Sequence, residues 1–132
     1  MFESHGHFKV SVQNNTIHVL ALGPFNTQAV SNYKEDLILA IQQIEGPWTQ
    51  LNQMHQNCLY TPEAQQQMHH LTQFRKEQGL IAVAFIFKDC FGASILQEQL
   101  SSIYSKIRIP CQFFDDSASA SLWLQQQMDS SI

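Results

Sequence analysis

The chain has 132 residues, 44% of them hydrophobic, and a formal net charge of −4 at pH 7. This length fits one domain with a core that needs no disulfide or metal staples, and the hydrophobic content excludes a disordered chain. The seven basic residues are scattered rather than gathered in a stripe, so we expect no nucleic-acid binding.

No targeting or membrane-spanning segment is recognisable in the sequence. The N-terminal MFESHGHFKV has no basic region followed by an apolar stretch, unlike a signal peptide. The longest apolar run, residues 80–87, is far shorter than the roughly 20 residues that span a bilayer. We therefore expect a cytoplasmic protein that is not an integral membrane protein. Its three widely spaced cysteines should be free thiols in that compartment.

The chain begins with the pattern of a β-hairpin. In residues 7–13 apolar and polar side chains alternate, as they do in a half-buried strand. Asn14 and Asn15 suit a tight turn, because asparagine tolerates a positive φ angle. Residues 16–22 are expected to form the return strand.

The next segment predicts a helix followed by a third strand. The helix should start at Asn26 or Thr27 and stop at the Gly46-Pro47 pair. Its apolar residues recur at helical steps: Val30, Tyr33, Leu37, Ile41 and Ile44. The segment Trp48–Gln56 is predicted as a strand from its position, although its polar residues fit poorly in a strand buried on both faces.

A second helix is predicted to begin at Thr61-Pro62-Glu63. These residues supply an N-cap, a first-turn proline and an acid near the positive end of the helix dipole. The helix should run to Gly79. Its buried stripe is expected to contain Ala64, Met68, Leu71 and either Phe74 or Arg75.

The last third of the chain predicts two more strand–helix pairs. Residues 80–87 are apolar without alternation, as in a strand covered by helices on both sides. Asp89 is placed to cap the helix that follows. Residues 109–114 should form a short last strand, and the sequence DDSASASLWL a capped terminal helix.

This pattern predicts the α/β class. The expected order is β-β-α-β-α-β-α-β-α in one domain over residues 1–132. Alternating strands and helices imply right-handed crossovers, and hence a single mixed, mostly parallel five-stranded sheet with helices on both faces.

Three stretches carry a resemblance to a known family: GPFN before the first helix, TPEA opening the second, and FFDDSASASLWL at the end. With the opening hairpin, they resemble the SpoIIAA-like branch of the STAS superfamily (sulphate transporter and anti-sigma factor antagonist domains) over nearly the whole chain. The resemblance implies a compact module that binds a protein partner or a small ligand rather than performing turnover. Relatives in that branch are similar in fold to lipid-binding Sec14 modules.

The chain departs from the family at two points. The best-understood members are switched by phosphorylation of a serine in an Asp-Ser-Ser-Gly-like run at the start of the helix after the third strand. This chain has QNCLYTPEA there, with Thr61 as the nearest hydroxyl at the helix start. A phosphorylation switch therefore does not carry over. The polar third strand is the second departure, because relatives place apolar residues and an aspartate on it.

Candidate ligand-binding residues gather where the strands are expected to end. In parallel sheets, ligands bind beyond the carboxyl ends of the strands, near helix N-termini. Capping explains the asparagine, the threonines and the aspartate equally directly, and is the simpler interpretation. The candidates are Phe25, Asn26, Thr27, Cys58, Tyr60, Thr61, Asp89, Cys90 and Phe91.

Two aromatic candidates, Phe25 and Phe91, fall in strand-to-helix loops. An apolar pocket between them would suit a lipid or another small apolar ligand. The alternative is that both side chains act as hydrophobic staples at the helix starts.

The cysteines and histidines are the candidates for reactive or metal-binding groups. Cys58 and Cys90 fall near expected helix N-termini, where the dipole lowers the pKa of a thiol. His55 lies three residues before Cys58, on the opposite side of a regular strand, so buried structural thiols are the default expectation. His5 and His7 could share one strand face, but His69 and His70 have no good ligand four residues away on their helix, so we expect no metal site.

We therefore expect a non-enzymatic regulatory or binding module of the STAS/SpoIIAA-like type. It would act through a protein partner and need no cofactor. The alternative is a small-molecule or lipid carrier with its pocket near Phe25, Cys58 and Phe91. The third hypothesis is a cysteine-dependent enzyme. Self-association into a homo-oligomer would explain the polar third strand and the hairpin edge.

Overall fold

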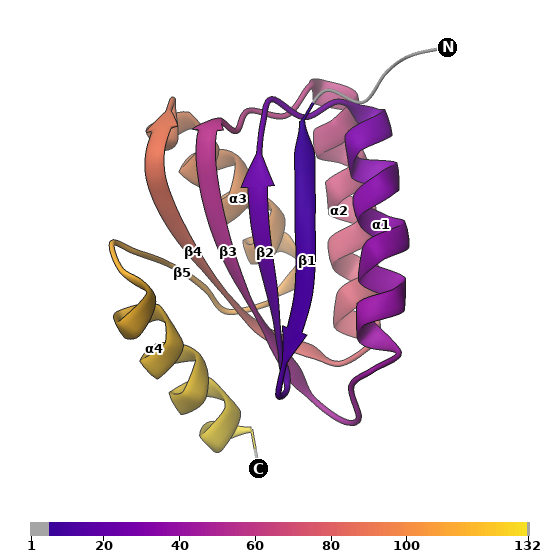
Figure 1. Ribbon diagram of the computed structural model, residues 1–132, viewed down its shortest axis with the longest axis vertical. Coiled ribbons are helices and arrows are strands. Elements are labelled where there is room, and N and C mark those ends of the chain that lie inside the picture. Colours follow the sequence, from indigo (N-terminus) through magenta and orange to yellow (C-terminus); the bar gives the residue numbers. More distant parts are fainter. Residues whose placement is uncertain (1–5, 132) are drawn as a thin grey trace.

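A computed structural model describes residues 6–131, with the side chain of Phe91 outside the description (Figure 1). Within this range the chain forms one mixed five-stranded sheet and four helices, which confirms the predicted α/β class. The elements are β1 (His7–Gln13), β2 (Thr16–Leu22), α1 (Thr27–Ile41), β3 (Trp48–Asn57), α2 (Pro62–Glu77), β4 (Leu80–Phe91), α3 (Ala93–Ile107), β5 (Cys111–Phe114) and α4 (Ser117–Ser130).

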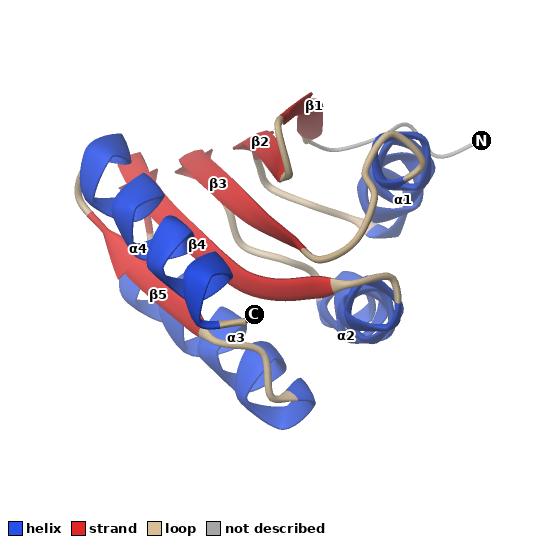
Figure 2. Cartoon of the chain, turned by 90° about the horizontal axis from the view of Figure 1, so that it is seen from below, coloured by secondary structure: helices blue, strands red, loops and turns tan. Residues whose placement is uncertain are grey.

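The strands lie side by side in the order of the chain. β1 pairs with β2 antiparallel, through a turn in which Asn14 has a φ of 56°. β2, β3, β4 and β5 pair in parallel. Because the three crossovers advance in one direction with one hand, α1, α2 and α3 share one face of the sheet. The terminal helix α4 covers the opposite face (Figure 2).

Two apolar cores result from this arrangement. The larger core lies between the sheet and helices α1–α3 and includes fully buried Ile17, Leu37 and Trp48. The smaller core lies under α4, where Ala120 and Leu124 pack on the far face of the sheet. The sheet residues of the smaller core are Leu51, Ala82, Ala84 and Ile86.

The polar third segment is a strand, as its position predicted, although its pairing with β4 shifts register after Trp48 and after His55. It runs from Trp48 to Asn57 and pairs in parallel on both sides. Its residues Thr49, Gln50 and Asn52 are buried although they are polar. Their polar atoms therefore need partners inside the protein.

Two predicted helix boundaries are wrong. The first helix ends at Ile41, so Ile44 lies beyond it and packs on the core from a loop. Asp89 does not cap the third helix: β4 continues to Phe91, and the N-cap of α3 is Gly92. The reason is sheet pairing, since Cys90 pairs with Gln56 beyond the expected strand end. No helix among residues 6–131 is long and apolar enough to cross a membrane.

Candidate functional site

The loops after β2 and β3 meet at the carboxyl edge of the sheet, as expected for parallel strands. The backbone N–H of Phe25 donates to the carbonyl of Leu59 at 3.0 Å, and the N–H of Thr61 donates to the carbonyl of Phe25 at 3.1 Å. Phe25 and Tyr60 therefore lie opposite each other. The structure does bring these sequence candidates together.

The polar candidates at this edge are used as helix caps. The Asn26 side chain accepts a hydrogen bond from the N–H of Ala29 at 3.0 Å, and the Thr61 hydroxyl accepts one from Ala64 at 3.1 Å. Thr27 is the exposed first residue of α1, and Asp89 is exposed within β4. Capping accounts for Asn26 and Thr61 without a ligand.

Phe25 belongs to the core rather than to the surface of a pocket. Its side chain is 1% exposed. Its ring stacks on Phe8 at a centroid distance of 4.4 Å and lies 4.9 Å from the ring of Tyr60, which is itself buried. The predicted apolar pocket between Phe25 and Phe91 cannot be placed, because the Phe91 side chain lies outside the described part of the chain.

The thiol of Cys58 is buried and protonated. Burial, followed by the neighbouring Cys90, raises its pKa to about 12. Its Sγ donates to the backbone carbonyl of His55 rather than to the imidazole ring. The expectation that a helix dipole would lower this pKa is therefore wrong, because Cys58 lies in the core and before the N-cap of α2.

Cys58 should consequently react slowly with alkylating reagents. At pH 7.5 we expect the native protein to be labelled by N-ethylmaleimide at Cys58 far more slowly than a free cysteine peptide. Peptide mass spectrometry separates Cys58 from Cys90 and Cys111, and the unfolded protein in guanidinium is the control. Native labelling as fast as that of the peptide would contradict this description.

A buried polar cluster lies between the sheet and α1–α3, and the sequence analysis did not identify it. Its centre is Arg75 of α2, which is fully buried. One guanidinium nitrogen donates to Gln50 Oε1 at 2.9 Å. The other donates to Thr72 Oγ1 at 2.7 Å and to Tyr104 Oη at 2.9 Å. We define the buried polar cluster as Tyr33, Gln50, Asn52, Thr72, Arg75 and Tyr104.

This cluster explains the polar third strand. Gln50 accepts from Arg75, and its amide nitrogen donates to Tyr33 Oη and to Asn52 Oδ1, each at 2.7 Å. Two features of the sequence indicate the buried polar cluster. A charged residue occupied a core position of α2, and amides interrupted a strand that should be apolar. Contact between α2 and β3 explains both, because Arg75 of α2 donates a hydrogen bond to Gln50 of β3.

The open part of the sheet lies beside α4. Because α4 packs over β3, β4 and β5, part of β1 and β2 on that face is left without a covering helix (Figure 1). We call the resulting hollow the α4 groove; it encloses about 450 Å³. Its lining residues are Gln13, Asn14, Asn15, Thr16, His18, Thr49, Ser121, Leu124, Gln125 and Met128.

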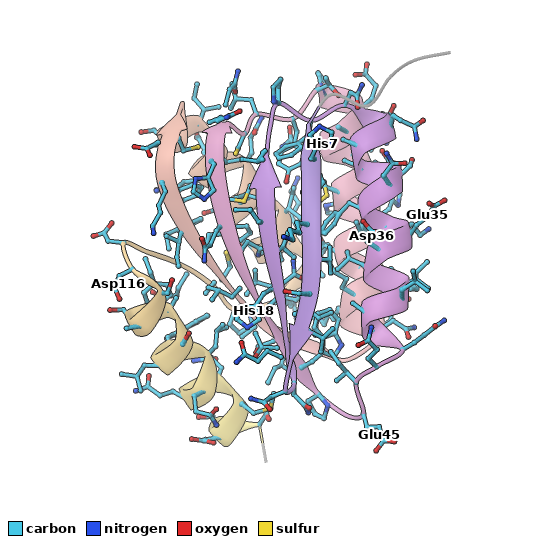
Figure 3. All side chains as sticks on the ribbon, in the orientation of Figure 1. His7, His18, Glu35, Asp36, Glu45 and Asp116 are labelled. Carbon is cyan, nitrogen blue, oxygen red and sulfur yellow. The ribbon has the colours of Figure 1, made fainter. Side chains whose placement is uncertain are left out.

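The hollow continues along β1 and β2. A second depression of about 190 Å³ shares His18 with the α4 groove and adds Lys9, Ser11 and Gln53. Figure 3 shows His18 between α4 and the strands, whereas Glu35 and Asp36 lie on α1 at the other side of the molecule. Apart from His18 and Lys9, the side chains lining both depressions are uncharged, so they offer hydrogen bonds rather than strong charge.

His18 should make stability depend on pH. Burial lowers the pKa of this half-buried imidazole from its ordinary value of 6.5. The unfolded chain then binds the proton more tightly than the folded protein. The stability that the fold gains from neutral His18 is therefore fully present above pH 6.5 and is lost as the pH falls below it. In urea titrations from pH 8 to pH 5, we expect wild-type protein to lose more stability than His18→Asn. Equal losses would contradict the burial of His18.

The other histidines among residues 6–131 do not gather into a group that could hold a metal ion. His7 is exposed on β1, and His5 lies outside the described residues. His69 and His70 are adjacent on α2, with ring centroids 6.3 Å apart. Over residues 6–131, no group of three or more histidine, cysteine or acidic side chains is arranged to hold a metal ion.

Comparison with known proteins gives no family assignment. No protein-family model matches the chain, and no curated protein matches it in sequence.

Proposed function

We propose that the protein is a non-enzymatic regulatory or binding module of the STAS/SpoIIAA-like type, and that it acts through a protein partner bound at the α4 groove. The observation that carries the proposal is the incomplete cover of the sheet. On the face opposite α1–α3, a single helix spans β3–β5 and leaves a hollow lined from β1, β2 and α4.

The chemistry of the groove suits a polypeptide. Thr16, Ser121 and Gln125 offer hydrogen-bond donors and acceptors, and Met128 adds an adaptable apolar contact. β1 is the first strand of the sheet. Among the described residues it pairs only with β2, so its other edge could accept an added strand from a partner. A partner segment could therefore contact both the groove and the edge of β1.

The carrier alternative has less support. Its proposed pocket requires Phe25 and Cys58 to face a ligand, but both side chains are buried in the packed core. The groove lies at a different place, on the face beside α4. The mixed sheet with its opening hairpin is compatible with the family resemblance, from which the binding role is proposed.

The test compares two variants of equal charge. In Ser11→Arg/Ser121→Arg, two large side chains occupy the hollow from β1 and from α4. In Ser101→Arg/Ser105→Arg, the same substitutions occupy exposed positions on α3, which covers the other face. Thermal melts followed by circular dichroism establish that both variants fold.

Tagged wild-type protein and both variants are then purified from the cells that naturally produce the chain, with cross-linking before lysis. We expect one partner to be recovered with wild type and with the α3 variant, but not with the groove variant. Equal recovery with the groove variant would place the contact elsewhere. Repeated purification of wild type without any partner would refute a protein-binding role.

A further inference from the structure

A small cavity lies inside the larger core, next to the buried polar cluster. Four members of that cluster line it: Tyr33, Gln50, Asn52 and Tyr104. Tyr60 and apolar side chains such as Met68 and Phe85 complete the wall. The space open to the centre of a water-sized sphere is about 10 Å³, which is roughly what one water molecule or one ion of similar size needs.

The cavity presents hydrogen-bond donors that lack acceptors. Asn52 is 3% exposed, and its amide nitrogen has no partner among the described residues. The hydroxyl oxygens of Tyr33 and Tyr104 already accept bonds from Gln50 and Arg75, so each hydroxyl proton is left to be donated. An unpaired buried donor is costly, so these groups call for a common acceptor.

The two side-chain amide oxygens at the cavity are already engaged. Gln50 Oε1 accepts from Arg75, and Asn52 Oδ1 accepts from Gln50. A water molecule would accept from at most two of these three donors, and it would bring two protons of its own, for which the wall offers hydroxyl oxygens such as that of Tyr60 but no unused side-chain amide oxygen. An anion accepts hydrogen bonds without donating any, and so matches this wall better.

The charge beside the cavity is positive, which also favours an anion. Arg75 donates to two of the lining residues, and all its hydrogen-bond partners in residues 6–131 are neutral oxygens. A guanidinium stays protonated at any ordinary pH, so a positive charge is buried here without an acidic partner. Burial raises the pKa of Tyr104 to about 12, so this hydroxyl remains a neutral donor.

We propose that this cavity binds one small monovalent inorganic anion of the size of chloride. The amide of Asn52 and the hydroxyls of Tyr33 and Tyr104 donate to the anion, and Arg75 supplies the compensating charge behind them. Sulfate and phosphate are larger than chloride, and the centre of a water-sized sphere has only about 10 Å³ in which to move here. The bound anion acts as an internal structural ion, separate from the α4 groove on the other face of the sheet.

The first measurement is the melting temperature of the full chain in sodium chloride and in sodium gluconate at the same ionic strength. Binding to the folded state raises the melting temperature by about 4 °C for each tenfold increase in chloride above the dissociation constant. We expect this rise in chloride but not in gluconate or sulfate. Equal melting curves in chloride and gluconate would overturn the proposal.

A matched pair of variants shows where the anion acts. Asn52→Asp is nearly isosteric and places a carboxylate at the cavity, so the melting temperature should lose its chloride dependence. Asn32→Asp makes the same change on the exposed surface of α1 and should keep it. Chloride dependence that persists in Asn52→Asp would overturn the assignment to this cavity.

Crystals of wild-type protein soaked in bromide give a test that does not rely on any variant folding. We expect an anomalous bromide peak within hydrogen-bonding distance of Asn52, Tyr33 and Tyr104. A cavity that is empty or that holds only a water molecule at high bromide concentration would overturn the proposal.

Discussion

Replacing Arg75 by alanine is expected to lower the free energy of unfolding by about 4 kcal/mol. The substitution removes a long, fully buried side chain and leaves a cavity against α3 and the sheet. It also leaves the oxygens of Gln50 and Tyr104 without the donor that they face at 2.9 Å. Loss of the buried positive charge offsets only part of this cost, because the charge has three hydrogen-bond partners.

Urea denaturation of the purified protein measures this effect. Gln66→Ala is the matched control, since Gln66 is an exposed residue of the same helix and its change should stay within about 0.5 kcal/mol. If Arg75→Ala were as stable as Gln66→Ala, the guanidinium would not be buried in the network described above.

Gln50→Leu is expected to destabilise the protein by about 3 kcal/mol, although leucine is apolar and suits a buried strand. Gln50 joins the two halves of the buried polar cluster, accepting from Arg75 and donating to Tyr33 and Asn52. Without it, a charged donor and two neutral groups lose their partners in the core. Urea denaturation again gives the measurement.

A double-mutant cycle separates this network from simple packing. In Gln50→Leu/Arg75→Met, both sides of the Gln50–Arg75 contact become apolar, so the leucine no longer leaves a charged donor unpaired. We expect the double variant to be more stable than the sum of the single effects implies, by at least about 1 kcal/mol. Strict additivity would show that the two side chains do not interact.

The fold could be predicted where local chemistry and tertiary packing agree. Asn26, Thr61 and Asp116 cap helices as their sequence context indicates, and their side chains accept from the backbone three residues ahead. Asp89 has the same capping chemistry but lies inside β4. There, pairing of Cys90 with Gln56 extends the strand and overrides the local signal.

The candidate sites could be predicted only in part. The loops that hold Phe25, Cys58 and Tyr60 do meet, because parallel strands end at one edge. Whether those side chains face a ligand or the core depends on how the two loops pack, which no local pattern encodes. Arg75 was hidden for a related reason: a charged residue in an apolar stripe is explained only by the strand it meets, and that strand is β3.

The α4 groove had no sequence signal of its own. It exists because α4 is seated over β4 and its neighbours, where Ala82 and Ala84 present small side chains to Ala120 and Leu124. Thr16 and His18 come from β2 and Ser121 comes from α4, two segments that are far apart in the chain and share no motif. Their meeting follows from the position of one terminal helix.

Site-specific photo-cross-linking in living cells tests the binding role of the α4 groove most directly. A photoreactive amino acid is placed in turn at Ser11 and Ser121 in the hollow, and at Ser101 and Ser105 on α3. We predict a discrete cross-linked protein adduct from Ser121 in the α4 groove and from Ser11 in the adjoining depression, and none from the two α3 positions. Adducts from the α3 positions alone would contradict a partner bound at the open face of the sheet.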